Sequence, residues 1–358
     1  MFHNQSFEES SGYSTCALAR VGDNQITADK AAAGSLEEKT GSRLAASADL
    51  SKSEAFLHAA QISTDTTALR LLKPGETTHE TIDIDGQERH YNLHLPKGYD
   101  GKEPLPVVLV FNGWGNKPNQ GNLPAGADGM EPVTGFSEKA DKDKFIVVYM
   151  DGNEKIDRSW NNGQWWFSKE NDLKFVDSVL SGLERDLNVD KSRYYLSGFS
   201  QGASFAHRLA NAMPERFAAL ASVGGWLTGK EEKEAERADV KPAVSSISIL
   251  QMHSTDDKVA PFDGRNWWLK MKTPVEMMEY YRKHDGISTP TVLESSIANN
   301  GTNRIDHISV NRATGAEVHL IQLEGAGHIW FGGPGTSNSP ISATDETWNF
   351  FKRHKLQK

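Results

Sequence analysis

The sequence is poor in three features, and each absence limits the kind of protein it can be. A single cysteine, Cys16, occurs among 358 residues, so the chain cannot form an internal disulfide or a cysteine-rich metal cluster. Acidic residues outnumber basic ones by 48 to 39, for a net charge of −9, and this balance disfavours binding to nucleic acid or to an anionic membrane surface. No stretch reaches the roughly 18 consecutive apolar residues that a membrane-spanning helix needs. We therefore expect no nucleic-acid partner and no membrane span.

The first 75 residues differ in composition from the rest of the chain. The segment 26–61 is rich in alanine, serine and charged residues and has no spaced bulky apolar residues until Phe56 and Leu57. This composition predicts a disordered extension over residues 1–75 and a folded domain over residues 76–358. The beginning of the chain also lacks the cationic and apolar regions of a signal peptide. A cytoplasmic location is the default expectation, with export by another route left open.

The folded part alternates between strand and helix patterns. Polar and apolar residues alternate on both sides of an Asp85-Gly86 turn, which predicts a leading antiparallel hairpin. Short, nearly continuous apolar runs predict buried strands over residues 105–111, 144–150, 193–197, 217–225, 247–252 and 317–323. Helical spacing, as in Leu173, Val176 and Leu180, predicts amphipathic helices between them. This order predicts an α/β protein with a mostly parallel central sheet and helices on both faces.

The motif "GFSQG" at residues 198–202 follows one predicted strand directly and opens a predicted helix near Ala203. A serine on a sharp turn between a strand and a helix is the arrangement of a nucleophile elbow, in which flanking glycines relieve crowding. Alternatively, Ser200 is a helix N-cap. A cap does not require glycine on both sides, so the motif favours a nucleophile. This interpretation requires an acid and then a base later in the chain.

Two later loops supply these residues. "HSTDDKVAPF" (253–262) and "EGAGHIWFGG" (324–333) each follow a predicted strand. A serine hydroxyl becomes a good nucleophile when an imidazole takes its proton, and the imidazole needs a carboxylate to fix its tautomer. We predict His328 as the base and Asp257 as the acid, with the adjacent Asp256 as the rival.

Other polar residues near these motifs have more ordinary interpretations. We take His207 as a residue of the helix face without a catalytic role, and His253 as the donor or acceptor of a structural hydrogen bond. The sequence contains no dinucleotide fingerprint and no phosphate loop. We therefore expect no cofactor and no bound metal.

Several segments together resemble one family of hydrolases. They are "GFSQGASFAHRLANAMPERFAALASVGG", "HSTDDKVAPF", "GAGHIWFGG", "DGNEKIDRSWNNG" and "NDLKFVDSVL". The chain is similar over residues 80–350 to the polyhydroxybutyrate depolymerase and feruloyl esterase family of α/β hydrolases. The resemblance implies an α/β-hydrolase fold without a large cap domain, and serine-dependent hydrolysis of carboxylic esters. The family's nucleophile, acid and base fall on Ser200, Asp257 and His328.

The sequence departs from the family pattern near the expected site. Asn112 stands where histidine is usual, and Trp114 where cysteine or another aromatic residue is common. An oxyanion hole uses backbone N–H groups, so these changes need not remove it. We predict that the N–H groups of Gln201 and Trp114 form the hole. Ser254 replaces a usual glycine and Phe331 a usual proline, which puts the family's substrate preference in doubt.

Tryptophan is concentrated after the predicted strands, where α/β sheets bind their ligands. We predict that Trp114, Trp166 and Trp330 bind substrate, because flat indole faces stack on sugars, phenolic rings or polyester chains. Only residues 263–315 could form a modest excursion over the site. The expected cleft is open and suits a bulky or polymer-linked ester.

Two other functions remain compatible with this fold. A serine peptidase shares the triad and the strand order, but no propeller and no segment that would bind a peptide terminus is visible in the sequence. A non-catalytic binding module would retain the glycines and tryptophans and lose the triad. Because all three triad residues are present, the sequence favours an esterase that acts on a small-molecule or polymeric ester.

Overall fold

The computed structural model describes residues 73–115, 124–164, 167–228, 247–265, 271–298, 300–336 and 338–356. All of them belong to one unit of the chain, Asp65–Lys358. The extension predicted over residues 1–75 lies almost entirely outside the described residues. That extension and the domain boundary near residue 76 remain predictions.

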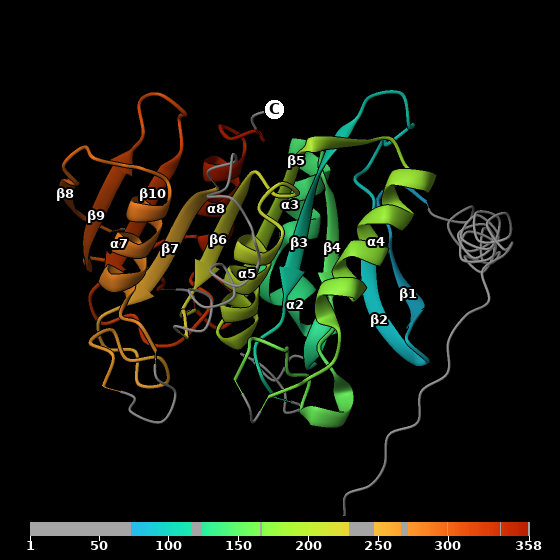
Figure 1. Cartoon of the computed structure of the whole chain (residues 1–358), viewed down its shortest axis with the longest axis horizontal. Helices are drawn as coiled ribbons and strands as arrows, with labels where there is room; N and C mark the ends of the chain where they lie inside the picture. Colours follow the sequence, from blue (N-terminus) through green and yellow to red (C-terminus); the bar gives the residue numbers. More distant parts are fainter. Residues whose placement is uncertain are drawn as a thin grey trace, which may run out of the picture. The chain divides into compact units, whose positions relative to one another are not determined.

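The described residues form one ten-stranded sheet with the order β1-β2-β4-β3-β5-β6-β7-β10-β9-β8 (Figure 1). Its strands are β1 (Thr77–Ile84), β2 (Gln87–His94), β3 (Leu105–Phe111), β4 (Ile146–Met150), β5 (Val189–Phe199), β6 (Ala219–Val223), β7 (Ser248–Ser254), β8 (Val292–Ile297), β9 (Asn303–Val310) and β10 (Glu317–Leu323). The six neighbouring strands from β4 to β10 are parallel. Antiparallel pairs flank them on both sides. The predicted mostly parallel sheet and its leading hairpin are confirmed.

The central strands are apolar along their whole length because both of their faces are covered. Every residue of β4 and all but the first residue of β3 are buried, as expected for parallel strands between two helix layers. One layer contains α4 (Asp172–Asp186), α5 (Gln201–Ala212) and α7 (Pro274–His284), and it lies in front of the sheet in Figure 1. The other contains α2 (Gly126–Thr134), α3 (Phe136–Asp143) and α8 (Ala343–Phe351). Each layer encloses its own hydrophobic core.

The described part of residues 263–315 differs from its prediction. After Gly264 the chain forms α7, which packs against β7 and β10, and then β8 and β9, which extend the sheet by antiparallel pairing. These two strands escaped sequence analysis because all residues of β8 are exposed and β9 mixes charged with apolar residues. The modest excursion expected over the site is therefore mainly an enlargement of the sheet.

The carboxyl ends of the parallel strands meet at one edge, the lower edge of the sheet in Figure 1. The loops that follow β5, β7 and β10 carry Ser200, Asp257 and His328 respectively. No helix in the described ranges is both long enough and apolar enough to cross a membrane.

Candidate active site

Ser200 occupies a strained turn between β5 and α5. The strand ends at Phe199 and the helix begins at Gln201, so Ser200 alone makes the turn. Its φ of 54° and ψ of −124° lie in a region that side-chain-bearing residues rarely adopt. Its side chain makes no capping hydrogen bond to the helix. Ser200 precedes the helix, but its hydroxyl does not bond to a free N–H of the first turn. The N-cap interpretation of this side chain is therefore wrong.

The two glycines of the motif are required by close backbone contacts. A Cβ atom at Gly198 would lie 2.7 Å from the Cα of Ala203 in the first turn of α5. A Cβ atom at Gly202 would lie 2.2 Å from the carbonyl oxygen of Asn112. Larger residues would push the helix away from β5 and from the loop after β3. The two glycines thus allow the serine turn to pack closely against α5 and against the loop after β3.

Ser200, His328 and Asp257 form a continuous chain of hydrogen bonds. The Oγ of Ser200 lies 2.9 Å from Nε2 of His328, and Nδ1 of His328 lies 2.6 Å from Oδ2 of Asp257. A carboxylate can only accept, so Nδ1 carries the ring proton and Nε2 is left to accept the serine proton. This tautomer is the one that a general base for the hydroxyl needs.

The Asp257 carboxylate is held in its ionised form. Its Oδ1 accepts hydrogen bonds from the backbone N–H groups of Val259 and Ala260, both at 2.8 Å. Burial raises the pKa of Asp257, but the hydrogen bonds and charge interactions with His328 outweigh burial, and its pKa lies below the ordinary value. A buried negative charge therefore faces the Nδ1 side of the imidazole.

Asp256, the rival acid, has a different set of partners. Its Oδ1 accepts from the hydroxyl of Ser254 at 2.5 Å and from the N–H of Gly327 at 2.9 Å. The hydrogen bond from Ser254 is the main reason why the pKa of Asp256 is lowered. The Oγ of Ser254 also accepts the N–H groups of Ala326 and Gly327. Asp256 and Ser254 thus hold the backbone next to His328 and do not contact its ring.

The two backbone N–H groups predicted to bind an oxyanion belong to segments next to Ser200. The N–H of Gln201 belongs to the first turn of α5, where no carbonyl of the helix can accept it. The loop after β3 passes close by, since a Cβ atom at Gly113 would lie 3.4 Å from the Cβ of Ser200. Trp114 follows Gly113 directly in the chain. Both predicted donors therefore come from segments that contact the serine.

Asn112, the departure from the usual histidine, braces this loop. Its Nδ2 donates to the carbonyl oxygens of Gly113 and Arg158 at 2.7 and 2.9 Å, and its Oδ1 accepts from Gly152 N–H at 3.0 Å. The amide therefore joins the loop after β3 to the loop after β4. Asn112 therefore supports the loop after β3.

The side chain of Gln201 provides a second brace that sequence analysis missed. Its Oε1 accepts the N–H of Trp160 at 3.1 Å, and its Nε2 donates to the carbonyl of the same residue at 2.7 Å. The indole Nε1 of Trp160 in turn donates to the carbonyl oxygen of Asn112 at 3.0 Å. The one feature of the sequence that could have indicated this brace is a glutamine directly after the motif serine, at the start of a predicted helix.

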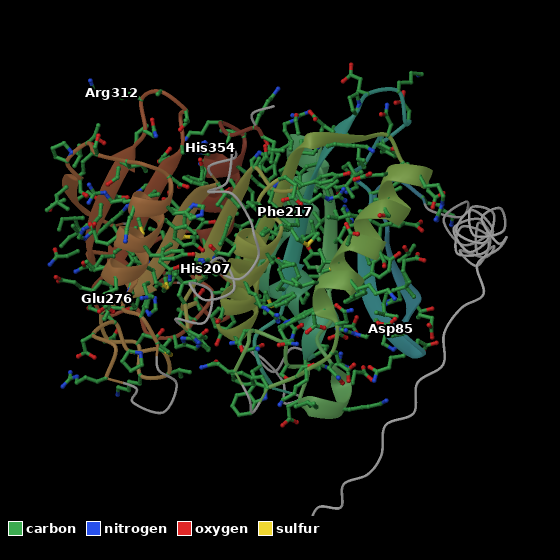
Figure 2. The ribbon with its side chains drawn as sticks, in the orientation of Figure 1. Asp85, His207, Phe217, Glu276, Arg312 and His354 are labelled. Atoms are coloured by element: carbon green, nitrogen blue, oxygen red, sulfur yellow. The ribbon has the colours of Figure 1, made fainter. Side chains whose placement is uncertain are left out.

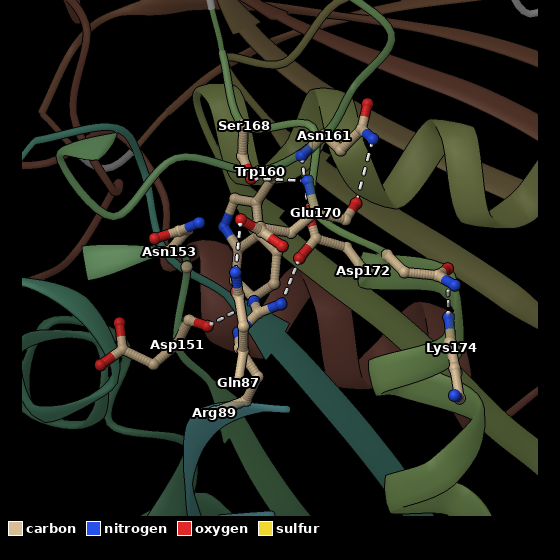
Figure 3. Close-up of polar contacts among 12 residues, drawn as sticks. Gln87, Arg89, Asp151, Asn153, Trp160, Asn161, Ser168, Glu170, Asp172 and Lys174 are labelled. Atoms are coloured by element: carbon tan, nitrogen blue, oxygen red, sulfur yellow. Dashed lines mark hydrogen bonds and ion pairs between the residues drawn. The ribbon is translucent and has the colours of Figure 1, made fainter. Parts of the chain in front are cut away.

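A buried ion pair anchors the described part of the loop between β4 and α4 (Figure 3). Nη1 of Arg89 lies 2.7 Å from Oδ1 of Asp172, and both side chains are almost fully buried. Oδ2 of Asp172 accepts the N–H of Asn161 at 2.6 Å, and Arg89 also lies over the ring of Phe175. Loss of one partner would leave an unpaired buried charge. The pair therefore fixes the residues next to Trp160.

The predicted tryptophan surface is wrong at Trp330. Trp330 is fully buried, donates from Nε1 to Thr344 and packs edge-on against Phe136, so it belongs to the core under α8 and cannot stack on substrate. Trp160 is also fully buried. Trp114 is 55% exposed and contacts Phe167 edge-on. Trp166 lies outside the described residues, and its role stays a prediction.

Both histidines set aside by sequence analysis are buried and hydrogen-bonded. His253 lies between Gln251 and the carbonyl of Ala260, in line with the structural role expected for it. His207 lies on the buried face of α5, and burial lowers its pKa to about 4. Among the described residues, no three histidine, cysteine or acidic side chains are grouped in a way that would hold a metal ion.

A mostly parallel sheet covered on both faces, with a serine at a strand-to-helix turn and with an aspartate and a histidine on later loops of the same edge, defines an α/β hydrolase. The chain matches the Esterase family ("Putative esterase") over residues 83–279 and belongs to this family.

Known proteins resemble the chain over most of its length. It is 26% identical to "Probable feruloyl esterase C" of Aspergillus niger over 269 residues, which cover 75% of this chain and 84% of the relative. It is 25% identical to "Feruloyl esterase C" of Emericella nidulans over 275 residues, which cover 76% and 87%. Among solved structures, the acetyl xylan esterase from Aspergillus awamori has a similar fold, with a TM-score of 0.50, 14% identity and coverage of 77% of this chain and 99% of that one. The protein is an esterase that hydrolyses carboxylic esters.

Proposed function

We propose that this esterase forms a covalent acyl-enzyme on Ser200. The observation that carries the proposal is the hydrogen-bonded chain Ser200–His328–Asp257, with distances of 2.9 and 2.6 Å. His328 accepts the serine proton at Nε2, and the negative charge of Asp257 stabilises the imidazolium that forms. The strained backbone of Ser200 keeps its hydroxyl aimed at this base.

The reaction proceeds in two steps, acylation of Ser200 and hydrolysis of the acyl-enzyme. In the first, Oγ of Ser200 bonds to the ester carbonyl carbon, its proton passes to His328, and the alcohol leaves with that proton as the carbon–oxygen bond breaks. In the second, His328 takes a proton from water, the resulting hydroxide attacks the acyl-enzyme, and the proton returns to Oγ as the acid is released. The N–H groups of Gln201 and Trp114 stabilise the oxyanion in both steps.

The substrate that we favour is a feruloyl or acetyl group esterified to a polysaccharide. The names of the feruloyl esterase C relatives support an aromatic acyl group, and the exposed indole of Trp114, on the loop after β3, supplies a face for such a ring. An aromatic pair contributes about 0.5–1.5 kcal/mol beyond buried area. Polyhydroxyalkanoate esters form the second substrate class.

The test is a hydrolysis panel with p-nitrophenyl acetate, methyl ferulate, acetylated xylan and polyhydroxybutyrate, on the wild type and on Ser200→Ala. We expect wild-type turnover with the highest kcat/KM on methyl ferulate or acetylated xylan, and labelling of Ser200 by a serine-directed organophosphonate. Turnover by the alanine variant at the wild-type rate would refute the acyl-enzyme. Preference for polyhydroxybutyrate would refute the polysaccharide ester as substrate.

A further inference from the structure

A row of buried polar side chains runs from α7 across α5 to the loop that carries Asp257. It contains Tyr281, His207, Gln251 and His253, none more than 1% exposed. Figure 2 labels His207, which lies on α5 and is fully buried. Burying polar groups without hydrogen-bond partners costs free energy. The partners of each side chain in this row therefore show what holds it in the core.

The protonation of His253 follows from its two neighbours. Its Nε2 lies 2.7 Å from the carbonyl oxygen of Ala260, which can only accept, so Nε2 carries a proton. Its Nδ1 lies 3.0 Å from Nε2 of Gln251, an amide nitrogen that also donates to the carbonyl of Gly225 at 3.2 Å. Nδ1 therefore accepts. His253 is a neutral imidazole held at both nitrogens.

The rest of the row has the same direction. Nε2 of His207 donates to Oε1 of Gln251 at 3.4 Å, and Nδ1 of His207 accepts from the hydroxyl of Tyr281 at 2.8 Å. Nδ2 of Asn211 donates to that hydroxyl at 3.2 Å. Each residue from Tyr281 to His253 thus donates one hydrogen bond to the next member of the row, and hydrogen bonds in such a series polarise one another. The row ends on the loop of the catalytic acid.

The Ala260 end of the row contacts the Asp257 carboxylate. The N–H of Ala260 donates to Oδ1 of Asp257 at 2.8 Å, while Nε2 of His253 lies 3.6 Å from Oδ2. Oδ2 is the atom that accepts from His328. A shift of Ala260 would remove one of the two backbone donors to Oδ1, the other being the N–H of Val259, and would leave the carboxylate freer to rotate away from the imidazole. No other described side chain donates to the Ala260 carbonyl.

We propose that His253 is a positioning residue of the ester hydrolysis: by binding the Ala260 carbonyl it holds the Asp257 carboxylate at the angle that directs His328 toward Ser200. This role rests on the proposed acyl-enzyme mechanism. His253 does not touch the reacting atoms. It acts through Ala260 and Asp257, so its loss lowers kcat and leaves substrate binding intact.

Two neutral substitutions separate the Ala260 contact from general packing. In His253→Gln the side-chain nitrogen reaches the place of imidazole Nε2 and can still donate to Ala260. In His253→Asn the amide reaches only as far as the Nδ1 position, so it satisfies Gln251 and leaves Ala260 without its donor. We expect the Gln variant to keep kcat within about 3-fold of wild type and the Asn variant to lose roughly 100-fold, as for a catalytic group displaced by about 1 Å. KM stays within about 2-fold in both.

A control pair tests whether loss of any buried histidine has this effect. His319 is buried on β10, toward the strand's beginning and away from the loop that carries His328, where it is paired with Asp306 at 2.7 Å. His319→Gln and His319→Asn are expected to lower the melting temperature and to leave kcat unchanged. Equal kcat losses in the Gln and Asn variants of His253, or wild-type kcat in both, would overturn the proposal.

The His328–Asp257 hydrogen bond gives a readout that does not depend on turnover. Its proton is expected as a far-downfield signal in the proton NMR spectrum of wild type and His253→Gln, and to be lost or shifted in His253→Asn. An unchanged signal in the Asn variant would overturn the role of His253. If the folded wild type hydrolyses no ester, the proposed function fails, and the NMR comparison alone then decides whether His253 positions Asp257.

Discussion

The Oγ of Ser200 lies 2.9 Å from Nε2 of His328, although 128 residues separate them in the chain. Two strands, β6 and β7, stand between β5 and β10 in the sheet. The loop after β10 spans this distance at the carboxyl edge. Gly224, directly after β6, leaves room for the imidazole, since a Cβ atom there would lie 3.1 Å from its ring. The site thus depends on a glycine that contributes no chemistry.

Two substitutions of Ser200 separate its effect on catalysis from the effect of its strained backbone on stability. Ser200→Ala is expected to lower kcat by roughly 10⁴ or more, because the nucleophile is lost. Ser200→Gly should be equally inactive but more stable than the alanine variant by about 1 kcal/mol, because glycine adopts a φ of 54° without strain. Ester hydrolysis and thermal unfolding measure the two effects. A glycine variant less stable than the alanine variant would argue against strain at this turn.

The two adjacent aspartates should respond differently to the same substitution. Asp257→Asn is expected to reduce kcat by about 10³ to 10⁴, since the amide no longer holds the imidazole in the required tautomer. Asp256→Asn should cost far less, because it keeps an oxygen for the Gly327 N–H and does not face the ring. Steady-state kinetics on one ester decides the matter, and reversed effects would identify Asp256 as the acid.

Ser254 offers a test of how the His328 loop is held. Ser254→Ala removes the acceptor of two backbone N–H groups, so we expect a loss of about 1–3 kcal/mol in the free energy of unfolding. The kcat should also fall, by about 10-fold, because the loop beside His328 loosens. Ser248, at the other end of β7, is a matched control that accepts the N–H of Glu317. Ser248→Ala should lower stability with kcat unchanged, and equal kcat in both variants would contradict the role of Ser254.

His207 should make stability depend on pH. Its ordinary pKa of 6.5 applies to the unfolded chain, and burial lowers it to about 4 in the folded one. The unfolded state therefore binds more protons between these values, and the contribution of His207 to stability is complete above pH 6.5 and is lost as the pH falls to about 4. The loss is on the order of 3 kcal/mol. The raised pKa of His319 acts in the opposite direction, so the measurement must be a difference.

That difference is between wild type and His207→Gln in denaturant unfolding at pH 7 and pH 4.5. Glutamine keeps a donor for Gln251 and does not titrate. The wild type is expected to lose more stability than the variant over this interval. Parallel losses would show that His207 does not titrate differently on folding.

Trp114 and Trp330 should have separate effects on substrate binding and stability. Trp114→Ala keeps the backbone N–H and removes an exposed ring, so KM for methyl ferulate should rise about 10-fold with little change for p-nitrophenyl acetate. Trp330→Phe removes the hydrogen bond to Thr344 inside the core and should lower the melting temperature without a change in KM. A selective rise in KM for Trp330→Phe would restore it as a substrate residue.

Sequence patterns predicted the sheet well where the strands are apolar. The runs at residues 105–111 and 317–323 have the same bounds as β3 and β10, because a strand buried on both faces must be apolar throughout. The hairpin of β8 and β9 was missed for the complementary reason. Its residues are largely exposed, so its pairing with β10 left no apolar pattern in the chain.

Within the site, the sequence by itself determined the serine turn and the order of the three loops, because glycine spacing and strand ends are local features of the chain. Tertiary structure alone decided which aspartate faces His328, since neighbouring side chains on a loop point in directions set by distant partners such as Gly327 and Ala260. It also decided that Trp330 belongs to the core and Trp114 to the surface. Burial of an aromatic ring depends on what packs over it, here α8 from the end of the chain, and no local pattern records that contact.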